Sequence, residues 1–277
     1  MDTFLYGAQV QAGGTRQHYL RYGGKGEPLI LLPGITSPAI TWGFVAQYLG
    51  QHFDTYVVDI RGRGLSSSGA DLDYSTDRCA ADVIALADAL GLGEFHLMGH
   101  SMGARFALRA NQLGLADRLK SLCLIDPPVS GPGRRPYPSQ LPWYVDSIRQ
   151  AREGMDAEAM RAFCPTWTEE QLALRAEWLH TCDEQAVVQA FNEFHEVDIH
   201  PCFASIKARA LLMVAGRGGV IEPADIAEIQ ALAPGLEVAT VTQAGHMIPW
   251  DDLPGFLAAV GTFYDIDFDF TEGDCNE

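Results

Sequence analysis

The stretch Gly99-His100-Ser101-Met102-Gly103 decides how the fold of this chain is interpreted. It follows the apolar run Phe95-His96-Leu97-Met98, which predicts a buried strand, and it precedes a segment from Phe106 to Arg109 that predicts a helix. Small residues on both sides of a serine allow a sharp turn from strand to helix, which lifts the hydroxyl clear of the backbone. The free amides at the start of the helix point to where negative charge develops during attack on a carbonyl. Ser101 is therefore the predicted nucleophile.

Short apolar runs alternate with amphipathic segments along most of the chain, as in parallel strands joined by crossover helices. The other expected strands cover residues 29–32, 56–58, 122–125, 211–214 and 237–241. A hairpin of residues 4–10 and 17–22, which turns at Gly13-Gly14, is expected to precede them.

The stretch from about residue 130 to residue 200 interrupts this alternation. It opens with the proline- and glycine-rich residues 131–138 and continues as helical segments at 143–152, 169–180 and 184–195. We therefore predict an α/β-hydrolase fold with a mostly parallel central sheet that is flanked by helices. Residues 1–130 and 201–265 would form this core, residues 131–200 an inserted helical cap, and residues 266–277 a loose acidic tail.

His246 lies just after the last expected strand, so the serine comes first and the histidine last along the chain, as this fold requires. In most proteins of this fold the acid follows the preceding strand, but Gly219 stands there in this chain. Asp126, which ends the strand at 122–125, is the predicted acid, and Glu222 is the alternative. The acid would hold the imidazole tautomer and stabilise the imidazolium.

The loop Pro33-Gly34-Ile35-Thr36 follows the strand at 29–32. The backbone amides of Ile35 and Met102 are expected to form the oxyanion hole. His195 and Glu196 lack the second histidine that a helical zinc site needs, so no metal ligand is predicted.

Charge and composition narrow the classes of partner. The formal net charge of −17 disfavours nucleic acid and anionic membrane surfaces, because the long-range field repels both. The first residues have neither the basic flank nor the apolar run of a signal peptide, so a cytoplasmic location is expected. The six cysteines have no close pairs, which favours reduced and mostly buried thiols. No obligate protein partner is inferred.

Residues 16–24, 33–42, 126–138 and 214–223 together resemble the N-formylmaleamate deformylases of aerobic nicotinate degradation. The similarity extends over nearly the whole chain and includes cap residues. It implies hydrolysis of N-formylmaleamate to maleamate and formate through a formyl-enzyme, without a metal or a dissociable cofactor. The absence of an acid at Gly219 also fits this family, which has an aspartate available at the position of Asp126.

Such a substrate carries a carboxylate, which a net charge of −17 would repel unless an arginine meets it. Arg134 and Arg135, at the entrance to the cap, are the first candidates, and Arg217 is the third. Tyr137 and Trp143 are expected to line the pocket.

Two other functions remain open from the sequence. A carboxylesterase or a carbon–carbon bond hydrolase would use the same side chains on another small carboxylate. A ligand-binding receptor on a hydrolase scaffold is a third reading, which a complete set of Ser101, His246 and Asp126 disfavours.

Overall fold

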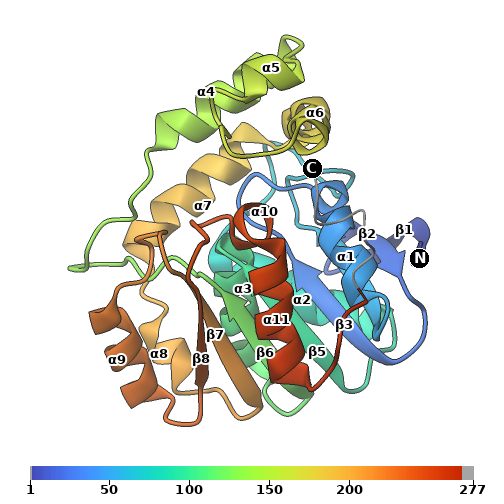
Figure 1. The fold of residues 1–277 in the computed structure, drawn as a ribbon. Coiled ribbons are helices and arrows are strands. Elements are labelled where there is room, and N and C mark those ends of the chain that lie inside the picture. The colour runs from blue at the N-terminus through green and yellow to red at the C-terminus, as the bar shows by residue number, and fades with distance from the viewer. Residues whose placement is uncertain (1, 270–277) are drawn as a thin grey trace.

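A computed structural model describes residues 2–269 of the chain, and its centre is an eight-stranded sheet (Figure 1). The strand order is β1-β2-β4-β3-β5-β6-β7-β8, with β1, β2 and β4 paired antiparallel and the other neighbours parallel. The strands are β1 (Phe4–Ala12), β2 (Thr15–Tyr22), β3 (Glu27–Leu32), β4 (Phe53–Asp59), β5 (Phe95–His100), β6 (Leu119–Ile125), β7 (Arg209–Ala215) and β8 (Glu237–Val241). This confirms the predicted fold class and the expected hairpin.

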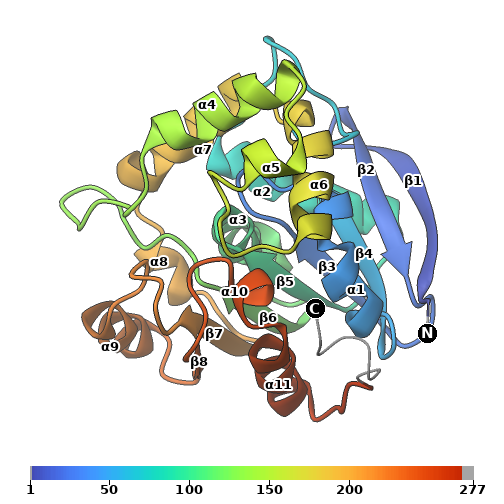
Figure 2. The ribbon, with the colours of Figure 1, turned by 45° about the horizontal axis from the view of Figure 1, so that its top comes forward.

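Helices cover both faces of the sheet, with α1 and α11 on one face and α2 and α3 on the other (Figures 1 and 2). The core helices are α1 (Gly43–Leu49), α2 (Thr76–Ala89), α3 (Met102–Ala110), α8 (His200–Phe203), α9 (Pro223–Leu232), α10 (Ile248–Asp251) and α11 (Leu253–Tyr264). Because helices cover both faces, β4 and β5 are buried along their whole lengths. Their sequences accordingly lack the apolar and polar alternation of a half-exposed strand.

The stretch expected to form a cap contains a group of helices at one end of the sheet, at the top of Figure 1. Its helices are α4 (Leu141–Arg152), α5 (Ala157–Met160), α6 (Glu169–Trp178) and α7 (Glu184–Glu196). They lie between β6 and β7 in the sequence, close to the expected 131–200. Since the carboxyl ends of parallel strands are where such sheets bind ligands, helices above that edge can cover a ligand site.

Two buried arginines connect the cap to the core. The guanidinium of Arg105, on α3, donates to the carbonyls of Pro128 and Val197 at 2.8 and 2.6 Å. Arg63 donates to the carbonyls of Ile35 and Ala186 at 3.1 and 3.2 Å. Hydrogen bonds from a charged donor are among the stronger ones, so these contacts fix the cap relative to the sheet.

The start of the expected tail packs against the core, which corrects the prediction of a loose segment from residue 266 onward. Phe268 contacts the rings of Tyr48 and His52 at centroid distances of 6.4 and 5.3 Å. His52 also hydrogen-bonds the carbonyl of Asp267 at 2.8 Å. Residues 270–277 lie outside the described part of the chain.

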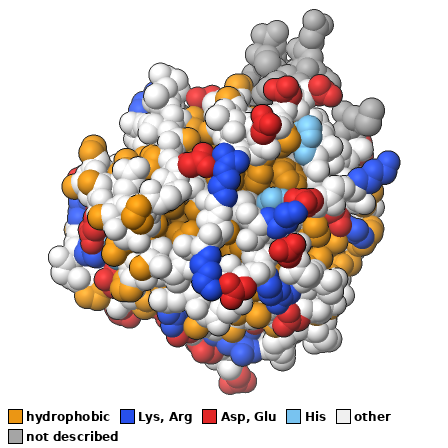
Figure 3. Space-filling view, turned by 90° about the horizontal axis from the view of Figure 1, so that it is seen from below, with side chains coloured by type: hydrophobic (Ala, Val, Ile, Leu, Met, Phe, Trp, Pro, Cys, Tyr) orange, Lys and Arg blue, Asp and Glu red, His pale blue; other side chains and the backbone are white. Residues whose placement is uncertain are grey.

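Five of the cysteines are buried free thiols, as predicted, and the sixth, Cys275, lies outside the described residues. Within residues 2–269 no helix has the length and apolar character needed to cross a membrane. Figure 3 shows the face away from the cap, where acidic and basic side chains are interspersed with apolar and uncharged ones.

Candidate active site

Ser101 occupies a strained turn between β5 and α3. Its φ and ψ of 53° and −119° lie where a side chain is rarely tolerated. Two glycines make the turn possible: a Cβ on Gly99 would lie 2.5 Å from the carbonyl oxygen of Gly103, and one on Gly103 would overlap the carbonyl oxygen of Leu32. The predicted motif therefore forms the sharp strand-to-helix turn that it requires.

Ser101, His246 and Asp126 form a continuous hydrogen-bonded chain. Oγ of Ser101 lies 2.9 Å from Nε2 of His246, and Nδ1 of His246 lies 2.7 Å from Oδ2 of Asp126. With the Nδ1 hydrogen donated to the carboxylate, Nε2 is left with a lone pair that faces the serine hydroxyl. This arrangement can remove the serine proton as the hydroxyl attacks a carbonyl carbon.

Asp126 is fully buried at the carboxyl end of β6. Its second carboxylate oxygen accepts a hydrogen bond from the amide of Ala215 at 3.2 Å, so both oxygens have a partner. The alternative acid, Glu222, lies elsewhere: it caps the start of α9 and pairs with Arg135 at 3.3 Å. The structure therefore brings Asp126, and not Glu222, to His246.

Ile35 and Met102, whose amides are predicted to form the oxyanion hole, lie close to the nucleophile in the fold. Ile35 is in the loop after β3 and lines the same cavity as Ser101, and Met102 is the first residue of α3. Neither amide donates to another residue within the described part of the chain. Both are therefore available to an oxygen on the substrate.

His100 supports the histidine loop from the other side of Ser101. Its Nε2 donates to the carbonyl oxygen of His246 at 2.9 Å, while its buried Nδ1 has no partner. Burial, and then the neighbouring His246, lower the pKa of His100 to about 3. His100 is therefore neutral at physiological pH and adds no positive charge beside His246.

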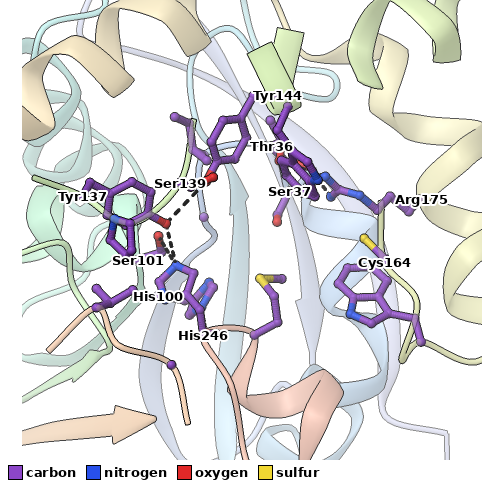
Figure 4. A pocket seen from close by; sticks show the side chains of 18 residues that line it. Thr36, Ser37, His100, Ser101, Tyr137, Ser139, Tyr144, Cys164, Arg175 and His246 are labelled. Atoms are coloured by element: carbon purple, nitrogen blue, oxygen red, sulfur yellow. Dashed lines mark hydrogen bonds between the residues drawn. The ribbon is translucent and has the colours of Figure 1, made fainter. Parts of the chain in front are cut away.

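A cavity of about 290 Å³ opens between the sheet edge and the cap, with Ser101 and His246 in its wall (Figure 4). That volume suits a small organic molecule. Tyr137, Tyr144, Trp143, Trp167, Cys164, Thr36, Ser37 and Arg175 are among the other residues that line it.

Tyr137 reaches the triad from the cap side. Its hydroxyl lies 3.2 Å from Nε2 of His246 and 3.4 Å from the hydroxyl of Tyr144. Its backbone amide donates to Nε2 of His195, on α7. Burial raises the pKa of Tyr137 well above its usual value, so the phenol stays protonated and can donate. Tyr137 and Trp143 thus line the pocket as expected.

The three arginines expected to meet the substrate lie outside the residues that line the pocket. Arg134 is held by Glu228 at 2.8 Å and Arg135 by Asp225 at 2.8 Å, so both are neutralised by α9. Arg217 is exposed on the loop after β7. These ion pairs join segments far apart in the chain. The closeness of Arg134 and Arg135 to Asp126 in the sequence therefore gave no sign of them.

Sequence reasoning missed Arg175, which lines the pocket from α6 and is 3% exposed. A signal was present, because Arg175 falls on the buried stripe formed by Leu172, Ala176 and Leu179 at helical spacing. A charged residue within such a stripe is rarely buried without a functional or structural reason.

Several other histidines have structural partners. His18 contacts Asp59 at 2.7 Å, His96 contacts Ser121 at 2.8 Å, and His200 contacts Asp198 at 2.7 Å. In the range 2–269, no three His, Cys, Asp or Glu side chains gather in a way that would hold a metal ion.

Comparison with known proteins identifies the family of the chain. Residues 27–253 match the family described as the alpha/beta hydrolase fold. The N-formylmaleamate deformylase of Pseudomonas putida is 69% identical over 265 residues, which cover 96% of this chain and 98% of that protein. The 2-(acetamidomethylene)succinate hydrolase of Mesorhizobium japonicum is 25% identical and covers 89% of this chain and 91% of that protein.

Solved structures give the same picture. The crystal structure of the N-formylmaleamic acid deformylase from Pseudomonas putida S16 superposes with a TM-score of 0.89 and 55% identity, covering 92% of this chain and 100% of that one. The E-2-(acetamidomethylene)succinate hydrolase superposes with a TM-score of 0.75 and 23% identity over 95% of this chain and 99% of that one, which indicates a shared fold alone.

Proposed function

The chain belongs to the alpha/beta hydrolase fold family, and we propose that within this family it hydrolyses the formyl amide bond of N-formylmaleamate to give maleamate and formate. The observation that carries the proposal is the pair of contacts that joins Ser101 to His246 at 2.9 Å and His246 to Asp126 at 2.7 Å, with Ser101 and His246 in the wall of the pocket. The relative that is 69% identical over 96% of the chain supports the choice of substrate.

The first half of the reaction transfers the formyl group to the enzyme. The hydroxyl of Ser101 attacks the formyl carbon while Nε2 of His246 takes its proton, and Asp126 stabilises the imidazolium that results. The carbonyl oxygen becomes an oxyanion, which the amides of Ile35 and Met102 can bind. The carbon–nitrogen bond then breaks as His246 gives its proton to the leaving nitrogen, which releases maleamate and leaves a formyl ester on Ser101.

The second half returns the enzyme to its starting state. Water gives a proton to His246 and attacks the formyl ester, and the same two amides bind the second oxyanion. The ester bond breaks as the proton passes from His246 to the oxygen of Ser101. Formate leaves, and apart from the water molecule these steps use side chains and backbone amides of this chain.

The hydroxyl of Tyr137 is a second hydrogen-bond donor beside Nε2 of His246, the atom that transfers the proton. Its hydroxyl and that of Ser101 both face Nε2 of His246, at 3.2 and 2.9 Å, although the nitrogen has one lone pair. During attack by Ser101 the tyrosine hydroxyl is free to turn to the substrate, on the side where the amide nitrogen leaves. We assign to Tyr137 the positioning of that leaving group.

A broader substrate range is the principal alternative, because the same triad would hydrolyse an ester or a carbon–carbon bond. The discriminating experiment compares kcat/KM for N-formylmaleamate with a panel of small esters and diketones. We expect kcat/KM for N-formylmaleamate to exceed that for the esters and diketones by at least about a hundredfold, because a site whose polar groups match one substrate discriminates against compounds that leave those groups unpaired. Equal or better turnover of a plain ester would favour the esterase reading.

Location and association stay predictions of this proposal. A cytoplasmic enzyme that acts on a small anionic amide without an obligate partner should be active as purified from the soluble fraction. Cell fractionation followed by size-exclusion chromatography with an activity assay would test both points.

A further inference from the structure

Arg175 is unlike the other charged groups near the pocket. Among the described residues that line the cavity it is the one arginine, and neither lysine nor a carboxylate is present beside it. The cavity wall therefore carries a positive charge although the formal net charge of the chain is −17. A local cation of this kind can attract an anion that the whole molecule repels.

The guanidinium of Arg175 is only partly satisfied by the protein. Its two terminal nitrogens donate to the carbonyl and the hydroxyl oxygen of Thr36, both at 3.0 Å. Its buried Nε has no hydrogen-bond partner, and within residues 2–269 no carboxylate forms an ion pair with it. In the described part of the chain, Arg63 and Arg105 are also buried without a carboxylate partner, but Arg175 differs from both because it lines the cavity and keeps an unpartnered Nε. Burying a charge without a counter-ion is costly, so a ligand in the cavity that supplies one would be favoured.

The walls around Arg175 favour a planar guanidinium in a fixed position. The rings of Trp143 and Trp167 lie 5.9 and 5.5 Å from its central carbon, within range of a cation–π interaction. The side chain is therefore held by aromatic rings and by Thr36, and it is already oriented before a ligand arrives. Preorganisation of this kind lowers the entropy lost on binding.

The same loop connects Arg175 with the reaction centre. Thr36, which fixes the guanidinium, directly follows Ile35, whose amide faces the scissile carbonyl in the proposed mechanism. Figure 4 shows Ser101, Tyr137 and His246 on one side of the pocket and Arg175 on the other. A substrate with its carbonyl oxygen on the Ile35 amide would extend its far end toward Arg175.

From these contacts we propose that Arg175 binds a carboxylate at the end of the substrate remote from the scissile bond. This contact would restrict the enzyme to short substrates whose leaving group ends in a carboxylate. The inference rests on the proposed function for the identity of the scissile group. The carboxylate stays in the leaving half of the substrate, so the product maleamate keeps the group that Arg175 recognises.

The first test measures binding without turnover. Maleamate is titrated calorimetrically into the Ser101→Ala protein and into the double variant that also carries Arg175→Gln. We expect the second substitution to weaken binding by about a hundredfold, as loss of a charge-assisted pair of hydrogen bonds does, and Arg175→Lys to give an intermediate loss. Arg149→Gln, a change of the same type at an exposed position on α4, should bind like the parent. Equal affinity in the Arg175→Gln variant overturns the proposal.

The second test separates recognition from support of the loop at Thr36. With Ser101 intact, the ratio of kcat/KM for N-formylmaleamate to kcat/KM for the neutral p-nitrophenyl acetate should fall by about a hundredfold in Arg175→Gln. A purely structural role would lower both values and leave the ratio unchanged, which contradicts the proposal. If N-formylmaleamate is not a substrate at all, the calorimetric test still shows whether Arg175 binds a carboxylate, independently of the proposed function.

The unsubstituted arginine provides a third test if the Arg175 variants do not fold. In the Ser101→Ala protein, maleamate should bind about a hundredfold more tightly than maleamide, its neutral diamide. A crystal structure of that complex should show the carboxylate within hydrogen-bond distance of the guanidinium. Equal binding of the two compounds, or a carboxylate directed away from Arg175, overturns the proposal.

Discussion

The carboxylate of Asp126 lies 2.7 Å from Nδ1 of His246, although the chain carries Gly219 at the position where proteins of this fold most often have the acid. The acid thus comes from the end of β6, while the usual position follows β7, the neighbouring strand in the sheet. Because the carboxyl ends of adjacent parallel strands meet at one edge, a side chain from either strand can reach the same imidazole.

Asp126→Asn should lower kcat by about ten-thousandfold, because an amide cannot hold the required histidine tautomer or stabilise the imidazolium. Glu222→Gln is the matched control and should leave kcat within about twofold, since Glu222 is half exposed and pairs with Arg135. Steady-state formate release measures both. The reverse order of losses would transfer the role of acid to Glu222.

Tyr137→Phe should lower kcat by roughly 10- to 100-fold, the range expected for a lost hydrogen bond to the leaving nitrogen in the transition state. Tyr144→Phe removes a hydroxyl that contacts Tyr137 at 3.4 Å and should have a smaller effect. Comparing kcat and KM for the two variants, with circular dichroism as a folding control, gives the answer. Equal losses in both variants would argue against a role for Tyr137 at the leaving group.

His100 should make the protein less stable in acid. Its pKa is lowered to about 3 from an ordinary value of 6.5, so between these values the unfolded chain binds a proton that the folded chain does not. Above pH 6.5 the protonation of His100 does not reduce the free energy of unfolding. As the pH falls from 6.5 toward 3, this free energy decreases by at most about 1.4 kcal/mol per pH unit.

His100→Gln keeps a donor for the carbonyl of His246 but removes the titrating group. Urea unfolding at several pH values from 4 to 7 should therefore give a shallower loss of unfolding free energy in the variant than in the wild type. Parallel curves for the two proteins would show that His100 does not titrate on unfolding in this range.

Gly103→Ala should destabilise the fold by about 3 kcal/mol or more, because the new methyl group would overlap the carbonyl oxygen of Leu32. Gly93→Ala is the control, since a Cβ at Gly93 meets nothing within 4 Å. Its free energy of unfolding should stay within about 0.5 kcal/mol of the wild type. Similar effects of the two substitutions would contradict the assigned close approach of β3 and α3.

The features predictable from sequence were those set by local pattern. The buried strands before Ser101 and Asp126, the position of His246 after the last strand and the hairpin at Gly13-Gly14 all follow from residue order and spacing. Parallel strands place their carboxyl ends at one edge, so motif position along the chain is enough to predict that these side chains meet.

The arginine that lines the pocket was harder to predict. Arg134 and Arg135 are close to Asp126 in sequence, yet the acidic side chains of α9 hold them away from the pocket. Arg175 reaches the pocket only because α6 folds back over the sheet edge, which depends on tertiary packing. The tail at Phe268 was misjudged for the same reason, since its contacts come from residues far away in the chain.

The proposed mechanism requires Ser101 to carry the formyl group of N-formylmaleamate during hydrolysis. The most direct measurement is formate release from this compound by the wild-type protein and by Ser101→Ala, at equal protein concentration. We expect stoichiometric formate and maleamate from the wild type and a rate lower by roughly a million-fold in the variant. Formate release that persists in Ser101→Ala, or its absence in the wild type, would contradict the mechanism.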